Sequence, residues 1–133
     1  MIKLQEKESK VWFTSDLHLG HKNIIKKLSS WSSGGQRDFE SIEEMDKTIM
    51  DGINFNVGKD DVLFMLGDSM FGKKDYTWLF DNINCKRLYV MAGNHCHTPN
   101  LTEACRKFNY PYIAAYGDEL KINNKDFAIS HYP

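Results

Sequence analysis

Small polar groups follow four short apolar runs of the sequence, and their residue types are those of divalent-metal ligands. The groups are Asp16-x-His18, Gly67-Asp68, Gly93-Asn94-His95 and the lone His131. Carboxylate, amide oxygen and imidazole together favour Mn, Fe, Zn or Ni over a metal selected by thiolates, and calcium prefers more oxygen ligands. The sequence therefore predicts a divalent-metal centre if the fold brings these groups together.

The four apolar runs are expected to be the strands that position these groups. They cover residues 11–14, 62–66, 88–91 and 127–130. Ligands of open α/β sheets bind beyond the carboxyl ends of the strands, so side chains scattered in sequence can converge there. Asp16 and His18 are expected to share one side of an extended backbone. Glycines before Asp68 and Asn94 would let the backbone turn tightly.

Helices are predicted between the strands, which gives a β-α alternation. Ser41 and Glu44 have the spacing of a capping box at the start of a helix over 41–54. A second helix is predicted over 76–83, with Trp78 and Leu79 turned inward. A third is expected to start at Thr98-Pro99, with Leu101, Ala104 and Phe108 facing the core.

The remaining segments are predicted to be shorter elements and surface. A brief helix is expected from Asn23, acting as its N-cap, and a Ser- and Gly-rich loop over 29–36. A hairpin is predicted with arms at 119–122 and 127–130. Lysine pairs at 26–27 and 73–74 are interpreted as solvent-exposed surface.

Length and composition favour one ordinary globular domain over residues 1–133. Apolar residues make up 41% of the 133 residues, and the formal net charge of −1 argues against non-specific binding of a nucleic-acid backbone. The sequence contains no membrane span or secretory signal, so we expect a cytoplasmic protein. The cysteines at 85, 96 and 105 form no C-x-x-C pair and are expected to be reduced thiols.

The order and spacing of D-x-H, G-D, G-N-H and a later lone histidine resemble those of the calcineurin-like metallophosphoesterases. The stretches 12–25 (WFTSDLHLGHKNII) and 130–133 (SHYP) are similar to the short versions found in bacteria and phages. The resemblance covers nearly the whole chain. It implies an α/β sandwich in which mixed β-sheets are flanked by helices, lacking its C-terminal portion.

The resemblance also implies a dinuclear site and a reaction. Asp16 and His18 would bind one ion, Asn94 and His131 the second, and Asp68 both, with Mn favoured and Fe, Zn or Ni as alternatives. His95 would be the catalytic residue that protonates or orients the leaving oxygen. A hydroxide bridging the metals would attack a phosphomonoester or phosphodiester. Small phosphoesters, nucleotides and nucleic-acid ends are the expected substrates, in the host cytoplasm if a phage encodes the protein, with no obligate protein partner.

The sequence departs from the family pattern in two places. The residue after G-N-H is usually acidic, and here it is Cys96. The family completes both metals with a later Gly-His-x-His, which these 133 residues do not contain. We expect the reading frame to continue past Pro133 and to encode that motif.

Several alternatives remain open at this level. Strand-end polar residues are also common as turn and cap residues. His21 could reach a phosphate or pack against the short helix, and Arg37 could contact a phosphate or be solvated. The tract 95–97 (HCH) could bind zinc, although adjacent residues seldom face one ion. The rival function is a catalytically weak or inactive calcineurin-like scaffold that binds a protein.

Overall fold

The computed structural model describes residues 1–71 and 75–133, in which strands and helices alternate along most of the chain. The strands are β1 (Ile2–Leu4), β2 (Val11–Thr14), β3 (Val62–Met65), β4 (Arg87–Met91), β5 (Tyr112–Ile113), β6 (Gly117–Ile122) and β7 (Lys125–Ser130). The helices are the 3-10 turn η1 (Lys22–Ile24), α1 (Ile42–Asn56), α2 (Tyr76–Asn82) and α3 (Thr98–Phe108). The predicted lysine pair 73–74 lies outside the described residues.

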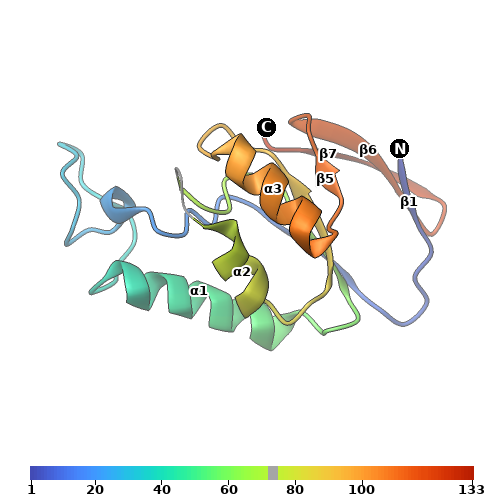
Figure 1. Ribbon diagram of the computed structural model, residues 1–133, viewed down its shortest axis with the longest axis horizontal. Coiled ribbons are helices and arrows are strands. Elements are labelled where there is room, and N and C mark those ends of the chain that lie inside the picture. Colours follow the sequence, from blue (N-terminus) through green and yellow to red (C-terminus); the bar gives the residue numbers. More distant parts are fainter. Residues whose placement is uncertain (72–74) are drawn as a thin grey trace.

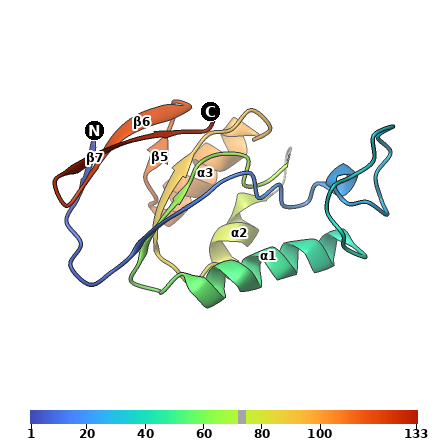
Figure 2. The same cartoon turned by 180° about the vertical axis from the view of Figure 1, so that it is seen from behind.

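Two sheets and a layer of helices build the molecule (Figures 1 and 2). The larger sheet has the order β2-β3-β4-β5 with every neighbouring pair parallel, and the smaller sheet has the order β1-β6-β7. In the smaller sheet β1 and β6 are parallel, whereas β6 and β7 are antiparallel. The predicted fold class, mixed β-sheets flanked by helices, is confirmed.

The central strand β3 explains why the layers pack as they do. Its four residues are all buried, and successive side chains point to opposite faces of the sheet. Leu63 and Met65 pack with apolar residues of α1, α2 and α3 in one core cluster. Val62 and Phe64 pack with residues of the smaller sheet in a second cluster. Because parallel strands end at the same edge, the segments after β2, β3 and β4 meet there.

Helix starts agree well with the sequence predictions. Ser41 caps α1 by accepting a hydrogen bond from the backbone N–H of Glu44 at 3.0 Å. The Glu44 carboxylate accepts from the N–H of Glu40 at 2.6 Å, rather than from the cap residue itself. One orientation was wrong, because Trp78 of α2 is 40% exposed while its neighbour Leu79 is fully buried.

Two local predictions need correction, and two short strands were not predicted. The turn η1 is preceded by His21, not capped by Asn23, whose side chain instead accepts from the N–H of Ser30 at 2.8 Å. The hairpin strands β6 and β7 are longer than predicted. They are joined by Asn123 and Asn124, both with positive φ, as a two-residue hairpin turn of type I′ requires. The sequence did not predict β1 or β5, which are too short to show a periodic pattern.

The expectation for the cysteines is met. All three cysteines are free, with Cys85 and Cys105 buried and Cys96 partly exposed. Within the described residues, no helix combines the length and apolar character needed to cross a membrane.

Candidate metal centre

The segments that follow β2 and β3 run side by side and are joined by backbone hydrogen bonds. The N–H of Asp16 donates to the carbonyl of Gly67 at 3.0 Å, and the N–H of His18 donates to the carbonyl of Asp68 at 2.9 Å. The pairing of the two strands therefore continues past the edge of the sheet. It brings the D-x-H motif next to the aspartate of the second motif.

Three of the predicted ligands adopt left-handed backbone conformations. The φ angles of Asp16, His18 and Asp68 are 56°, 52° and 50°. The expectation of an extended backbone for Asp16 and His18 was wrong, yet both side chains still face the same side. The intervening Leu17 and the following Leu19 are buried in the core and hold the segment in place. Left-handed non-glycine residues cost about 1 kcal/mol or more each and concentrate at functional sites.

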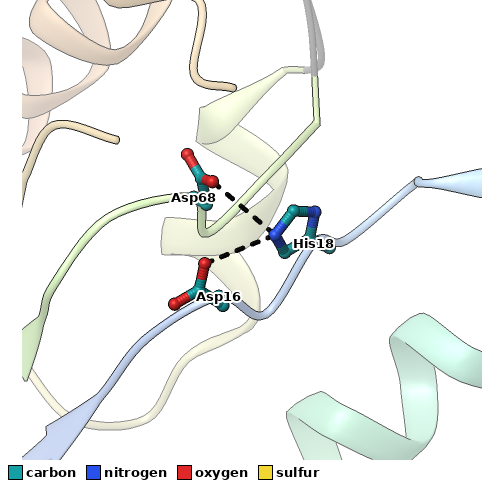
Figure 3. A group of neighbouring side chains, drawn as sticks. All are labelled: Asp16, His18 and Asp68. Atoms are coloured by element: carbon teal, nitrogen blue, oxygen red, sulfur yellow. Dashed lines mark ion pairs between the residues drawn. The ribbon is translucent and has the colours of Figure 1, made fainter. Parts of the chain in front are cut away.

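Asp16, His18 and Asp68 converge closely enough to share an ion (Figure 3). Nε2 of His18 lies 3.5 Å from Oδ1 of Asp16 and 3.6 Å from Oδ2 of Asp68. One possible ligand atom from each residue lies within 4.8 Å of the others. Two carboxylates and an imidazole directed at one point form a donor set that suits a divalent transition-metal ion.

A second pair of predicted ligands, Asn94 and His131, also lies beside Asp68. Nε2 of His131 is 2.9 Å from Oδ1 of Asn94 and 3.6 Å from Oδ2 of Asp68. Nδ1 of His131 lies 2.8 Å from the carbonyl oxygen of Leu66. Because a carbonyl oxygen can only accept, Nδ1 carries the hydrogen of this bond. The ring is thereby held with Nε2 directed at Asn94 and Asp68.

Asp68 occupies the middle of the whole group. Its Oδ2 is 3.6 Å from Nε2 of His18 and 3.6 Å from Nε2 of His131, both longer than a good hydrogen bond. Its Oδ1 accepts from the N–H of His95 at 2.8 Å, and its side chain is 2% exposed. A buried carboxylate placed evenly between two imidazole nitrogens could contact an ion on each side.

Two glycines make room for this carboxylate and its neighbours, as the sequence predicted. A Cβ at Gly93 would lie 2.1 Å from Oδ1 of Asp68, and one at Gly67 would lie 2.4 Å from Nδ1 of His131. Gly67 also has a φ of +105°, which side-chain-bearing residues rarely adopt. The close approach of the segments therefore depends on the absence of side chains at both positions.

His95 lies beside the group of ligands rather than within it. The residue is exposed, and its ring centroid is 5.7 Å from that of His18 and 5.9 Å from that of Phe71. Its backbone N–H, not its ring, contacts Asp68. The imidazole is therefore accessible to a molecule bound over the centre.

Arg37 has a position that sequence reasoning did not anticipate. Its Nη1 donates to the carbonyl of Leu17 at 2.5 Å, and its Nη2 donates to the carbonyl of Asp16 at 2.9 Å. The guanidinium is half-buried and is bonded to two carbonyls of the D-x-H segment, so Arg37 is not a fully solvated side chain. A bidentate contact to backbone carbonyls has no signature in sequence spacing.

The tract 95–97 does not converge on a common point. Sγ of Cys96 accepts from the N–H of Gly93 at 3.3 Å and lies 3.9 Å from Oδ1 of Asp68. His97 points away, because its Nδ1 accepts from the N–H of Asn100 at the start of α3. The alternative of a zinc-binding tract is therefore not supported, and His97 is a helix cap.

His21 is buried beside the centre and makes no capping hydrogen bond to η1. Its ring stacks on that of Phe71, with centroids 3.8 Å apart and planes 2° apart. Its Nδ1 lies 3.2 Å from Nδ1 of His18. Burial lowers the pKa of His21, and the nearby His18, His95 and Arg37 lower it further.

Comparison with known families identifies the family to which the chain belongs. A family model described as calcineurin-like phosphoesterase matches residues 9–131, so the chain belongs to the calcineurin-like phosphoesterase family. The family resemblance inferred from the motifs is confirmed.

Relatives come from phages and from an archaeon. The Gene 66 protein of Mycobacterium phage L5 is 36% identical over 146 residues, which cover 94% of this chain and 64% of that protein. An uncharacterized protein of Methanocaldococcus jannaschii is 33% identical over 89 residues, covering 65% of this chain and 46% of that protein. The Gene 66 protein of Mycobacterium phage D29 is 36% identical, covering 65% of this chain and 40% of that protein.

These matches span less than two thirds of the length of each relative. No solved structure matches the chain significantly.

Proposed function

We propose that this chain carries the metal-binding part of a divalent-metal-dependent phosphoesterase that hydrolyses a phosphomonoester or phosphodiester. The observation that supports this most strongly is the position of Asp68, whose Oδ2 is 3.6 Å from Nε2 of both His18 and His131. A single buried carboxylate close to both predicted ligand sets suits a pair of neighbouring ions.

The proposed ligand roles follow from this arrangement. Asp16 and His18 would hold one ion, Asn94 and His131 would hold the other, and Asp68 would contact both. Mn is the favoured metal, with Fe, Zn or Ni as alternatives. When bound, two such ions acidify a water molecule and neutralise charge on the phosphoryl oxygens.

His95 is proposed to act on the leaving group. Its ring is exposed next to His18 and is not occupied by a hydrogen bond to Asp68, which uses the backbone N–H instead. A donor so placed can give a proton to the leaving oxygen of a phosphoester bound over the centre. Small phosphoesters, nucleotides and nucleic-acid ends fit this role, and the proposed setting is the cytoplasm, that of the host if a phage encodes the protein.

The test uses the full-length protein with added Mn and two aryl substrates, a phosphomonoester and a phosphodiester. We expect metal-dependent turnover of at least one of them. Asp68→Asn is expected to lose at least about 100-fold in turnover, together with metal affinity. Even residues that only hydrogen-bond to a metal ligand typically cost about 10- to 100-fold in affinity or activity when they are replaced. His95→Ala is expected to lose about 10²- to 10⁴-fold in turnover while still binding Mn.

A matched control is His97→Asn, which removes an imidazole two residues from His95 but keeps a good helix-capping side chain. It should turn over substrate and bind Mn like the unmodified protein. If the full-length protein neither binds metal nor hydrolyses either substrate, the rival function, a protein-binding scaffold, replaces the enzyme.

A further inference from the structure

We propose that His21 is a positioning residue whose Nδ1 accepts a hydrogen bond from His18 and so directs Nε2 of His18 at the metal position. The inference rests on the proposed metal centre but adds a residue to it. The supporting contact is the 3.2 Å distance between the Nδ1 atoms of the two rings.

The other imidazole of the centre provides the comparison. His131 and His18 both direct Nε2 at Oδ2 of Asp68, each at 3.6 Å. The outer nitrogen of His131 is fixed by the carbonyl of Leu66, which can only accept a hydrogen bond. The outer nitrogen of His18 meets His21 instead. His21 is therefore to the outer nitrogen of His18 what the carbonyl of Leu66 is to the outer nitrogen of His131.

The hydrogen positions follow from the chemistry of a ligating imidazole. A His18 ring that binds an ion through Nε2 has no hydrogen there, so the neutral ring carries its hydrogen on Nδ1. In the contact between the two Nδ1 atoms, His18 is then the donor and His21 the acceptor. His21 must carry its own hydrogen on Nε2. Partners of this kind orient the ligating ring and increase its basicity.

The surroundings of His21 hold its ring in the accepting position. The residue is 6% exposed, its ring stacks face to face on Phe71, and Trp31 approaches it edge-on with centroids 5.3 Å apart. Its backbone N–H donates to the carbonyl of His18 at 3.1 Å, which keeps the two rings within one turn of the chain. Enclosed in this way, the ring offers little surface to a substrate phosphate.

Two substitutions separate the hydrogen bond from the packing. His21→Phe keeps an aromatic ring on Phe71 but has no acceptor, whereas His21→Asn keeps an acceptor oxygen close to the place of Nδ1 but loses the ring. We expect His21→Phe to weaken Mn binding about 10- to 100-fold in titration calorimetry of the full-length protein. His21→Asn should stay within a few-fold of the unmodified protein, and His97→Asn should be unchanged.

A second measurement does not depend on any variant. In the Zn-loaded, diamagnetic full-length protein, long-range ¹⁵N–¹H spectra of the imidazoles should show His18 protonated at Nδ1 and His21 protonated at Nε2. His18 protonated at Nε2 would overturn the proposal even if His21→Phe fails to fold. Equal Mn affinity in His21→Phe and the unmodified protein would also overturn it. If the unmodified protein does not bind Mn at all, the metal centre itself is refuted instead.

Discussion

Asp61 and Asp68 stand just before and just after β3, and their carboxylates meet opposite surroundings. Both oxygens of Asp61 are occupied by N–H donors, from Lys10 at 2.9 Å, Gly58 at 2.8 Å and the indole of Trp12 at 3.0 Å. Asp68 accepts one N–H bond on Oδ1, while Oδ2 faces two imidazole nitrogens at a distance too long for good hydrogen bonds.

The difference separates a structural carboxylate from one suited to bind an ion. Hydrogen bonds from three donors stabilise the charge of Asp61 within the fold and tie the start of β3 to the segment before β2. Asp68 is nearly fully buried, and its Oδ2 contacts lie beyond ordinary hydrogen-bond length. The carboxyl ends of the parallel strands thus hold a buried carboxylate whose Oδ2 has only long contacts to two imidazole nitrogens, whereas both oxygens of Asp61 at the amino ends accept from N–H donors at 2.8–3.0 Å.

The largest effect is expected from closing the space around Asp68. In Gly93→Ala the new Cβ would overlap Oδ1 and the backbone N of Asp68, at 2.1 and 2.3 Å. We expect a loss of about 3 kcal/mol in the free energy of unfolding, typical of severe overpacking, together with loss of Mn binding. Urea denaturation and calorimetry measure the two effects. Unchanged stability and metal affinity would show that the segments do not pack this closely.

The next largest effect is expected when each aspartate is replaced by asparagine in a separate variant. The stability of the two metal-free variants is compared by urea denaturation. Asp61→Asn turns one oxygen into an NH₂ group that faces N–H donors, so its denaturation midpoint should fall. Asp68→Asn can keep its one hydrogen bond to the N–H of His95 and should destabilise the fold less. The reverse order of the two midpoints would contradict the distinction between the carboxylates.

The cost of Asp61→Asn should also depend on pH. The N–H groups of Lys10 and Gly58 and the indole of Trp12 lower the pKa of Asp61 below its ordinary value of 3.8. A lowered folded-state pKa contributes stability that is fully present above the unfolded value and is lost as pH falls through the folded one. The difference in denaturation midpoint between the unmodified protein and Asp61→Asn should therefore be constant above about pH 5 and should become smaller below pH 3.8.

The smallest effect is expected from Gly52, the glycine of α1. A Cβ there meets nothing within 4 Å, so Gly52→Ala adds a better helix former without a clash. It should raise the free energy of unfolding by about 0.5–1 kcal/mol, with no change in Mn affinity. Together with Gly93→Ala it compares the same substitution in open and in crowded surroundings. A destabilised Gly52→Ala would mean that α1 is not a regular helix at this point.

Much of the fold was predictable because its strands and helices are strongly patterned. The apolar run of β3 and the capping serine of α1 were recognised almost to the residue. The short strands β1 and β5 were not, since two or three residues cannot show a period. Trp78 was misplaced because α2 has only 7 residues, about two turns, which is too short for periodicity to fix its buried face.

The sequence alone determined the family and the set of candidate ligands, because residue types and motif order carry that information. The tertiary structure decided what lies between the motifs. It placed Asp68 evenly between His18 and His131, put His21 behind His18, and bound the Arg37 guanidinium to backbone carbonyls. These contacts depend on left-handed turns and on segments that run side by side. Because tertiary packing sets that geometry, it produces no periodic pattern in the sequence.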